Sequence, residues 1–181
     1  NEEVIDLIAA QAGVGDEVAG ITERAMRGEL DFEASLRQRV ALLAGLDKAV
    51  LAQVRNQITL TKGAKALVTA AHEKGIKVGI VSGGFLEVIT PLLQELGIDF
   101  LLANSFEVSD GKLTGAIKGE IVDKARKATF LEECVATLGI NLSQSIAIGD
   151  GANDLEMIAK AGIGIAFCAK RALQEQAQVI I

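Results

Sequence analysis

The stretch that decides the fold is SIAIGDGANDLEMIAKA, residues 145–161. A short apolar run ends at Gly149, and Asp150, Asn153 and Asp154 follow before a helical apolar pattern resumes. In open parallel sheets, ligands bind outside the carboxyl ends of the strands. Two carboxylates four residues apart at such an end suit a hard cation bound through oxygen, such as Mg²⁺. The simpler alternative is that Asp150 only caps the helix that follows.

Composition narrows the class of protein. The chain has 181 residues, of which 50% are hydrophobic, so one domain with a modest insertion can bury a sizeable core. A net charge of −6 argues against nucleic acid and anionic membrane partners, and 3% aromatic residues argue against base stacking. No apolar run approaches the ~20 residues of a membrane span, and the chain does not open on a signal peptide pattern.

Three residues bear on the cellular compartment and on metal chemistry. Cys134 and Cys168 lie far apart, and we expect both to be reduced, buried thiols of a cytoplasmic protein. His72 is the single histidine and is expected at the surface. Histidine-based catalysis and a histidine-ligated zinc site are therefore disfavoured.

Residues 4 to about 60 have the pattern of helices. Asp16, Asp31 and Asp47 can each cap a helix that carries an apolar stripe, and Gly28 and Gly45 can end the first two. Three capped helices joined by tight glycine turns predict a small helical bundle.

After residue 63 the pattern alternates between helices and buried strands. A helix stops at Gly75, and a helix over about 85–96 is expected to kink or restart at Thr90–Pro91. Near-continuous apolar strands between helices predict a Rossmann-like α/β core with a mainly parallel sheet. The expected strands cover residues 76–81, 98–102, 145–148, 163–167 and 179–181.

One segment, SFEVSDGKLTGAIKG at 105–119, breaks the alternation. Its Asp110–Gly111 pair lies between two short alternating runs, which is typical of a β-hairpin. We expect a small flap on the core there.

A second group of polar residues follows the strand at 76–81. Ser82 and Gly83 can form an anion cradle, since glycine lets backbone N–H groups approach a ligand closely. Alternatively, they form a plain turn in which Ser82 caps a helix. Taken alone, Lys127, Arg39 and Glu3 are each most simply interpreted as solvated surface charges.

Four segments together carry a family resemblance: ERAMRGELDFEASLRQRVALL, VGIVSGGF, DGKLTG and IAIGDGANDLEMIAKAG. They resemble the phosphoserine phosphatase family of the haloacid dehalogenase superfamily, and the resemblance covers essentially the whole chain. It implies a helical cap at 1–60 that sets specificity, inserted after the first strand of the core, and an α/β core at 61–181 with the flap near 105–119.

The resemblance also implies roles at the phosphate. Ser82 and Gly83 would hold phosphoryl oxygens, and Asn153 would contact the substrate or its phosphate. Lys127 would neutralise phosphate charge and position the nucleophile, acting through its charge without stabilising the fold.

The cofactor implied by the resemblance is Mg²⁺. Asp150 would be a direct metal ligand, and Asp154 would orient Asp150 or the water around the ion.

In the cap, the resemblance implies that two residues of opposite charge bind the amino group and the carboxylate of the substrate. Glu3 would read the amino group of serine and Arg39 its carboxylate, while Met26 and Phe32 would close over it and exclude water.

The implied reaction is hydrolysis of O-phosphoserine to serine and phosphate through a phospho-aspartyl intermediate, as the last step of serine biosynthesis. The family's Asp-x-Asp-x-Thr motif does not occur in the 181 residues, so we expect these residues alone to be inactive and poorly folded. The alternatives are a related phosphatase or phosphotransferase for another small phosphomonoester, or a non-catalytic Mg²⁺- or phosphate-binding remnant. A small-molecule substrate and a monomer or homodimer are expected.

Overall fold

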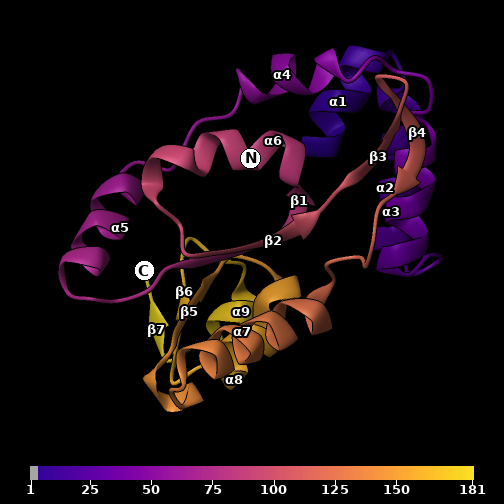
Figure 1. Ribbon diagram of the computed structural model, residues 1–181. Helices are drawn as coiled ribbons and strands as arrows, with labels where there is room; N and C mark the ends of the chain where they lie inside the picture. The colour runs from indigo at the N-terminus through magenta and orange to yellow at the C-terminus, as the bar shows by residue number, and fades with distance from the viewer. Residues whose placement is uncertain (1–3) are drawn as a thin grey trace. The chain divides into compact units, whose positions relative to one another are not determined.

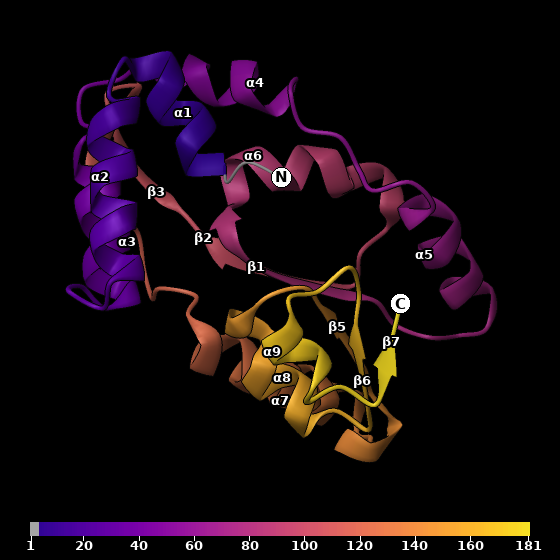
Figure 2. The same ribbon diagram turned by 180° about the vertical axis from the view of Figure 1, so that it is seen from behind.

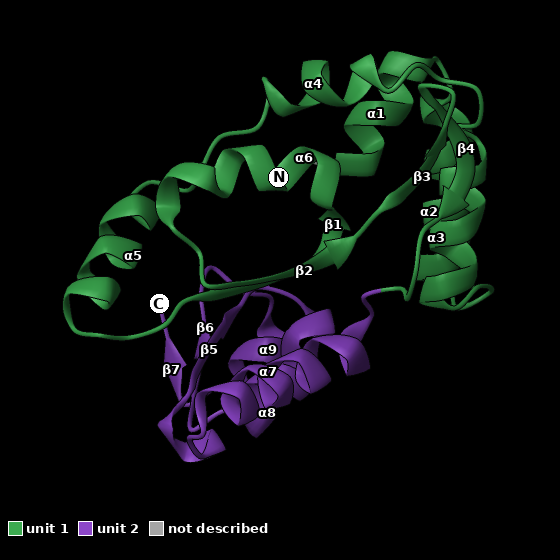
Figure 3. Ribbon diagram, in the orientation of Figure 1, with its two compact units in different colours: residues 1–121 green, residues 122–181 purple. Residues whose placement is uncertain are grey.

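The computed structural model describes residues 4–181 and divides into two compact units, residues 1–121 and 122–181 (Figure 3). Each unit has its own parallel sheet: β1–β2 in unit 1 and β5–β6–β7 in unit 2. The predicted α/β class with parallel strands is confirmed, but these strands form two separate sheets where one was expected. Among the described residues, β1 and β5 each have one edge without a partner strand.

Unit 1 begins with the predicted helices: α1 (Val4–Ala12), α2 (Gly15–Met26), α3 (Phe32–Ala41) and α4 (Ala49–Arg55). Asp31 caps α3 as predicted, because its carboxylate accepts the Ala34 N–H at 2.7 Å. The prediction for Asp16 is wrong, since α2 begins after Val14 and Asp16 lies within the first turn. A carboxylate there still interacts favourably with the helix dipole.

The parallel pair of unit 1 consists of β1 (Gly79–Phe85) and β2 (Phe100–Asn104), with α5 (Ala64–Glu73), α6 (Leu86–Leu93) and the 3₁₀ turn η1 (Gln94–Leu96). β1 begins three residues later than predicted and continues through the glycines at 83 and 84. Helix α6 runs on through Pro91 without the expected restart. In so short a helix, proline removes only one interior hydrogen bond.

The predicted hairpin is confirmed as β3 (Phe106–Ser109) and β4 (Lys112–Ile117), which pair antiparallel. Asp110 and Gly111 both have positive φ, 50° and 78°, as a two-residue type I′ turn requires. The hairpin lies beside α3 in both Figure 1 and Figure 2, and α3 contacts β4.

One apolar cluster joins the N-terminal helices of unit 1 to β1, α6 and the hairpin. Phe85 and Phe106 stack within it at a centroid distance of 3.7 Å. The cluster includes residues from both sides of residue 60. The division into a cap at 1–60 and a core at 61–181 stays a prediction. The buried members of the cluster are Ile5, Ile8, Ala9, Val18, Leu36, Val40, Leu43, Leu51, Val54, Phe85, Val88, Phe106, Leu113 and Ile117.

Unit 2 contains α7 (Lys124–Leu138), β5 (Ile146–Gly149), α8 (Leu155–Lys160), β6 (Ile163–Ala166), α9 (Arg171–Gln174) and β7 (Val179–Ile180). Two 3₁₀ turns, η2 (Leu142–Gln144) and η3 (Ala152–Asp154), flank β5. The strands pair parallel, and the three helices lie together on one side of them (Figures 1 and 2). This order leads the candidate metal segment directly from β5 into η3.

The structure also bears on the predicted cysteines and on membrane spans. Cys134 and Cys168 are both free thiols, but Cys134 is half-buried and Cys168 exposed, so the prediction of two buried thiols is wrong. Cys168 lies just after β6 with a positive φ of 46°, in a loop outside the core. Across residues 4–181, every helix is too short or too polar to cross a lipid bilayer.

Candidate functional site

The carboxyl end of β1 carries the candidate anion site of unit 1. The β1–β2 ladder keeps its register as far as Ser82, and the next pair is Phe85 with Asn104. Gly83 and Gly84 therefore form a bulge in the strand. A bulge at a strand end re-aims backbone groups, and glycine lets them approach a ligand closely.

Two side chains hold this bulge. The Gly84 N–H donates to Oγ of Ser82 at 3.0 Å, and Nδ2 of Asn104 donates to the carbonyl oxygen of Gly83 at 2.8 Å. The sequence analysis named Ser82 and Gly83 but missed Asn104, which is 0% exposed. The available signal was an amide directly after the apolar run of a predicted strand, in LLAN at 101–104.

In unit 2 the polar group is built around a buried ion pair. Nζ of Lys127 lies 2.7 Å from Oδ1 of Asp154, and the two side chains are each 7% exposed. Lys127 is in the first turn of α7, which Asp123 caps by accepting the Arg126 N–H at 2.7 Å. The interpretation of Lys127 as a solvated surface charge is therefore wrong. Whether Lys127 acts through its charge without stabilising the fold stays a prediction.

The second oxygen of Asp154 organises the loop after β5. Oδ2 accepts the backbone N–H groups of Asp150 and Gly151, each at 3.2 Å. A Cβ at Gly149 would lie 2.5 Å from Cβ of Asp154, so the close approach of this carboxylate to the strand end depends on glycine there. Asp154 is thus committed to Lys127 and to the loop backbone.

Asp150 and Asn153 are exposed in the same segment. The Asp150 carboxylate stands at the carboxyl end of β5, where its own N–H is already held by Asp154. Within residues 4–181, no group of three or more His, Cys, Asp and Glu side chains is arranged to hold a metal ion. A single carboxylate still suits Mg²⁺, which keeps several water ligands and takes one or two carboxylates from a protein.

The predicted cap residues that the structure describes lie on α2 and α3. Arg39, in the last turn of α3, is 5% exposed. Met26 ends α2 and is 81% exposed, and Phe32 begins α3 and is 40% exposed. Glu3, the predicted ligand of the amino group, lies outside the described residues.

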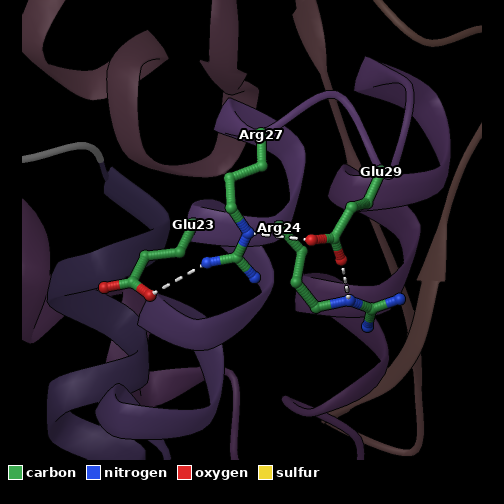
Figure 4. A network of polar contacts seen from close by, with 4 residues as sticks. All are labelled: Glu23, Arg24, Arg27 and Glu29. Carbon is green, nitrogen blue, oxygen red and sulfur yellow. Dashed lines mark hydrogen bonds and ion pairs between the residues drawn. The ribbon is translucent and has the colours of Figure 1, made fainter.

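The turn between α2 and α3 is held by a charged network that the sequence analysis did not single out (Figure 4). Nε of Arg27 and Nε of Arg24 contact the two oxygens of Glu29 at 2.8 and 3.4 Å. Arg27 also reaches Glu23 at 3.6 Å. Gly28 has a φ of 77°, and its N–H and that of Glu29 bond back to the last turn of α2 in a Schellman motif.

A further polar cluster of unit 1 surrounds Asp99, in the loop before β2. Its carboxylate accepts Nζ of Lys77 at 2.7 Å and the Val78 N–H at 2.9 Å, and Nε2 of His72 lies 3.1 Å away. The hydrogen bond from Lys77, followed by that from Val78, lowers the pKa of Asp99 from 3.8 to about 2. These contacts tie the end of α5 to the start of the parallel pair.

Ser82 and Gly83 thus belong to unit 1, as do Met26, Phe32 and Arg39. Within unit 2, hydrogen bonds bring together Lys127, Asp150 and Asp154, and Asn153 lies in the same turn.

Comparison with known proteins gives one family. The family model described as haloacid dehalogenase-like hydrolase matches residues 3–159. A phosphoserine phosphatase of Streptococcus thermophilus is 57% identical over 97% of this chain and 82% of its own length. One of Streptomyces coelicolor is 53% identical over 99% of this chain, which spans only 44% of that relative. A substrate-bound phosphoserine phosphatase structure matches with a TM-score of 0.90 and 45% identity, over 100% of this chain and 86% of that one.

Proposed function

The chain belongs to the haloacid dehalogenase-like hydrolase family, and we propose that it hydrolyses O-phosphoserine to serine and orthophosphate with Mg²⁺. The observation that carries the proposal is the 57% identity to a phosphoserine phosphatase of which the chain covers 82%. The polar groups at the ends of β1 and β5 support it, because they supply an anion cradle, a lysine and an open carboxylate. We also keep the cytoplasmic location and the monomer or homodimer as proposals.

At the phosphoryl group, we assign Ser82 and Gly83 to bind oxygens and Lys127 to neutralise charge and position the nucleophile. A lysine ammonium has three N–H donors, and Asp154 engages one of them at 2.7 Å. Two donors therefore remain for a phosphate and a nucleophile. Asn153, exposed in the turn after β5, would contact the substrate.

Mg²⁺ would be held by Asp150 and by water. The donor chemistry fits, because Asp150 is exposed while Asp154 is committed to Lys127 and to two backbone N–H groups. When bound, the ion screens the charge of the phosphate against the attacking group. Asp154 acts by holding the Asp150 backbone in place.

The amino acid head of the substrate would be read by Arg39 and Glu3. Arg39 is 5% exposed, and in so buried a position a guanidinium binds a carboxylate more strongly than in water. Met26 and Phe32 offer apolar area at the neighbouring ends of α2 and α3, and we assign them to the closure over serine.

The attacking aspartate and the aspartate that acts as acid and base would come from an Asp-x-Asp-x-Thr strand, a motif absent from the 181 residues. The free edges of β1 and β5 each allow a further strand to pair. We propose that residues 1–181 alone are inactive and that this strand, added before Asn1, restores phospho-aspartyl chemistry.

The test measures orthophosphate release from O-phosphoserine against Mg²⁺ concentration, for residues 1–181 and for the chain extended by that strand. In the active form, Arg39→Ala should raise KM strongly for O-phosphoserine and little for O-phosphoethanolamine, which lacks a carboxylate. Arg37→Ala is the matched control, because Arg37 lies on the same helix, is 51% exposed and forms an ion pair with the exposed Glu33. Equal losses on both substrates would remove Arg39 from recognition of the carboxylate.

The metal assignment has its own variant. Asp150→Asn should raise the Mg²⁺ concentration for half-maximal activity and lower kcat by orders of magnitude, because a neutral amide is a poor ligand for a hard cation. An unchanged midpoint would show that Asp150 only organises the loop.

A further inference from the structure

The bulge at the end of β1 is clamped at a single peptide group. The carbonyl of Gly83 and the N–H of Gly84 belong to one peptide plane and point in opposite directions, as a trans peptide requires. Asn104 binds the carbonyl at 2.8 Å, and Oγ of Ser82 binds the N–H at 3.0 Å. The plane is therefore held from both sides.

Asn104 is well placed to hold this peptide group. It is the last residue of β2, opposite Phe85 in the ladder, and its side chain is 0% exposed. Burying an amide is costly unless it is hydrogen-bonded, so the bond to Gly83 is well determined. Phe85 and Phe106, which are 1% and 3% exposed, stack in the cluster next to it and make the support rigid.

The contact with the Gly84 N–H determines which hydrogen bonds the Ser82 hydroxyl can still make. A hydroxyl has one O–H donor and two acceptor lone pairs. Because Oγ of Ser82 accepts the Gly84 N–H, one lone pair is occupied, and its own proton remains available to donate. A hydroxyl that is fixed as a donor suits an anion.

Resting on the proposed function, we propose that Asn104 is a positioning residue for phosphate: it fixes the Gly83–Gly84 peptide, and this peptide orients Ser82 as a donor to a phosphoryl oxygen. Asn104 does not touch the anion and acts through Ser82. The chemical class recognised at this point is a phosphate monoester or orthophosphate, through the phosphoryl oxygens that both share.

The experiment uses the chain in the form that releases phosphate in the assay above. Calorimetry with orthophosphate should give a dissociation constant about tenfold higher for Asn104→Ala than for wild type, the size of one lost hydrogen bond. Losses in kcat/KM should be equal for O-phosphoserine and O-phosphoethanolamine, because both present the same phosphoryl group. The Mg²⁺ midpoint should not move.

A double-mutant cycle with Ser82→Ala separates positioning from a structural role. If Asn104 acts through Ser82, Asn104→Ala should change the orthophosphate dissociation constant less than twofold in the Ser82→Ala background. Additive effects would overturn the proposal. Leu96→Ala is the control, because Leu96 lies in a separate apolar cluster of unit 1 and its loss lowers stability without touching the bulge.

Wild type provides a reading that needs no variant at Asn104. Hydrogen exchange of the Gly84 amide should be slowed, and Ser82→Ala should accelerate it; a freely exchanging Gly84 amide in wild type would overturn the clamp. A wild-type chain that neither binds orthophosphate nor releases it would overturn the proposed function as well. Wild-type binding that Asn104→Ala leaves within twofold would overturn the positioning role alone.

Discussion

Replacing Lys127 by methionine tests the buried ion pair of unit 2. Methionine keeps most of the volume and removes the charge, so the Asp154 carboxylate keeps only the two long backbone bonds from Asp150 and Gly151, at 3.2 Å. The two side chains of the pair are each 7% exposed, and little water can replace the lost ammonium.

The expected magnitude follows from this burial. Removing one partner of a buried pair costs about 3–5 kcal/mol, because an uncompensated charge remains in the interior. For a chain of this size, 1 kcal/mol shifts Tm by about 2–4 °C, so the loss corresponds to a fall of about 6–20 °C. The double variant Lys127→Met with Asp154→Asn should lose less than the two single variants together, by about 0.5–3 kcal/mol.

The assay is chemical unfolding, with the free energy extrapolated to water. Lys160→Met is the matched control: Lys160 lies 2.7 Å from Glu132, the same N–O distance, but each side chain is 42% exposed. An exposed pair is worth at most about 1 kcal/mol. The reasoning is refuted if Lys127→Met and Lys160→Met lose the same small amount.

Two further predictions concern titration and thiol chemistry. The lowered pKa of Asp99 contributes stability that is present above pH 3.8 and is lost as the pH falls towards about 2. Asp99→Asn should therefore be less stable than wild type at neutral pH. In acid unfolding, this difference in stability should shrink between pH 3.8 and about 2. Burial raises the pKa of the Cys134 thiol, so iodoacetamide followed by peptide mass spectrometry should label the exposed Cys168 first, and faster labelling of Cys134 would contradict its half-buried position.

The sequence is most informative where one local rule decides the structure. Asp110–Gly111 predicts a type I′ hairpin because the turn needs two positive φ angles, and both occur. Asp31 predicts a helix start because a side-chain oxygen there satisfies a free N–H, and it accepts Ala34 at 2.7 Å. The apolar runs also locate all five parallel strands, with ends that differ from the observed ones by at most four residues.

The sequence is least informative where a partner comes from a distant segment. Lys127 and Asp154 are 27 residues apart, and Asn104 is 21 residues from Gly83. No local period distinguishes a lysine that will be buried against a carboxylate from one on a solvated helix face. Pro91 is a different case: local propensity predicts that the helix kinks or restarts there, but α6 continues through Pro91 without restarting. In so short a helix, the proline costs one interior hydrogen bond.

The two candidate sites share one design, and it explains which residues sequence reasoning found. In each unit a buried polar side chain fixes a glycine-containing segment at the carboxyl end of a strand: Asn104 holds the bulge in β1, and Asp154 holds the loop after β5. The groups assigned to ligands, Ser82 and Asp150, are more exposed than these supports. A ligand must reach the exposed group. A rigid support has to be shielded from water, because water would compete for its hydrogen bonds. Motif reasoning finds Ser82, Asp150 and also Asp154, because they lie within short local motifs. Asn104 was missed because its partner is 21 residues away. Both supports depend on tertiary packing, so changing them should alter stability and ligand affinity together.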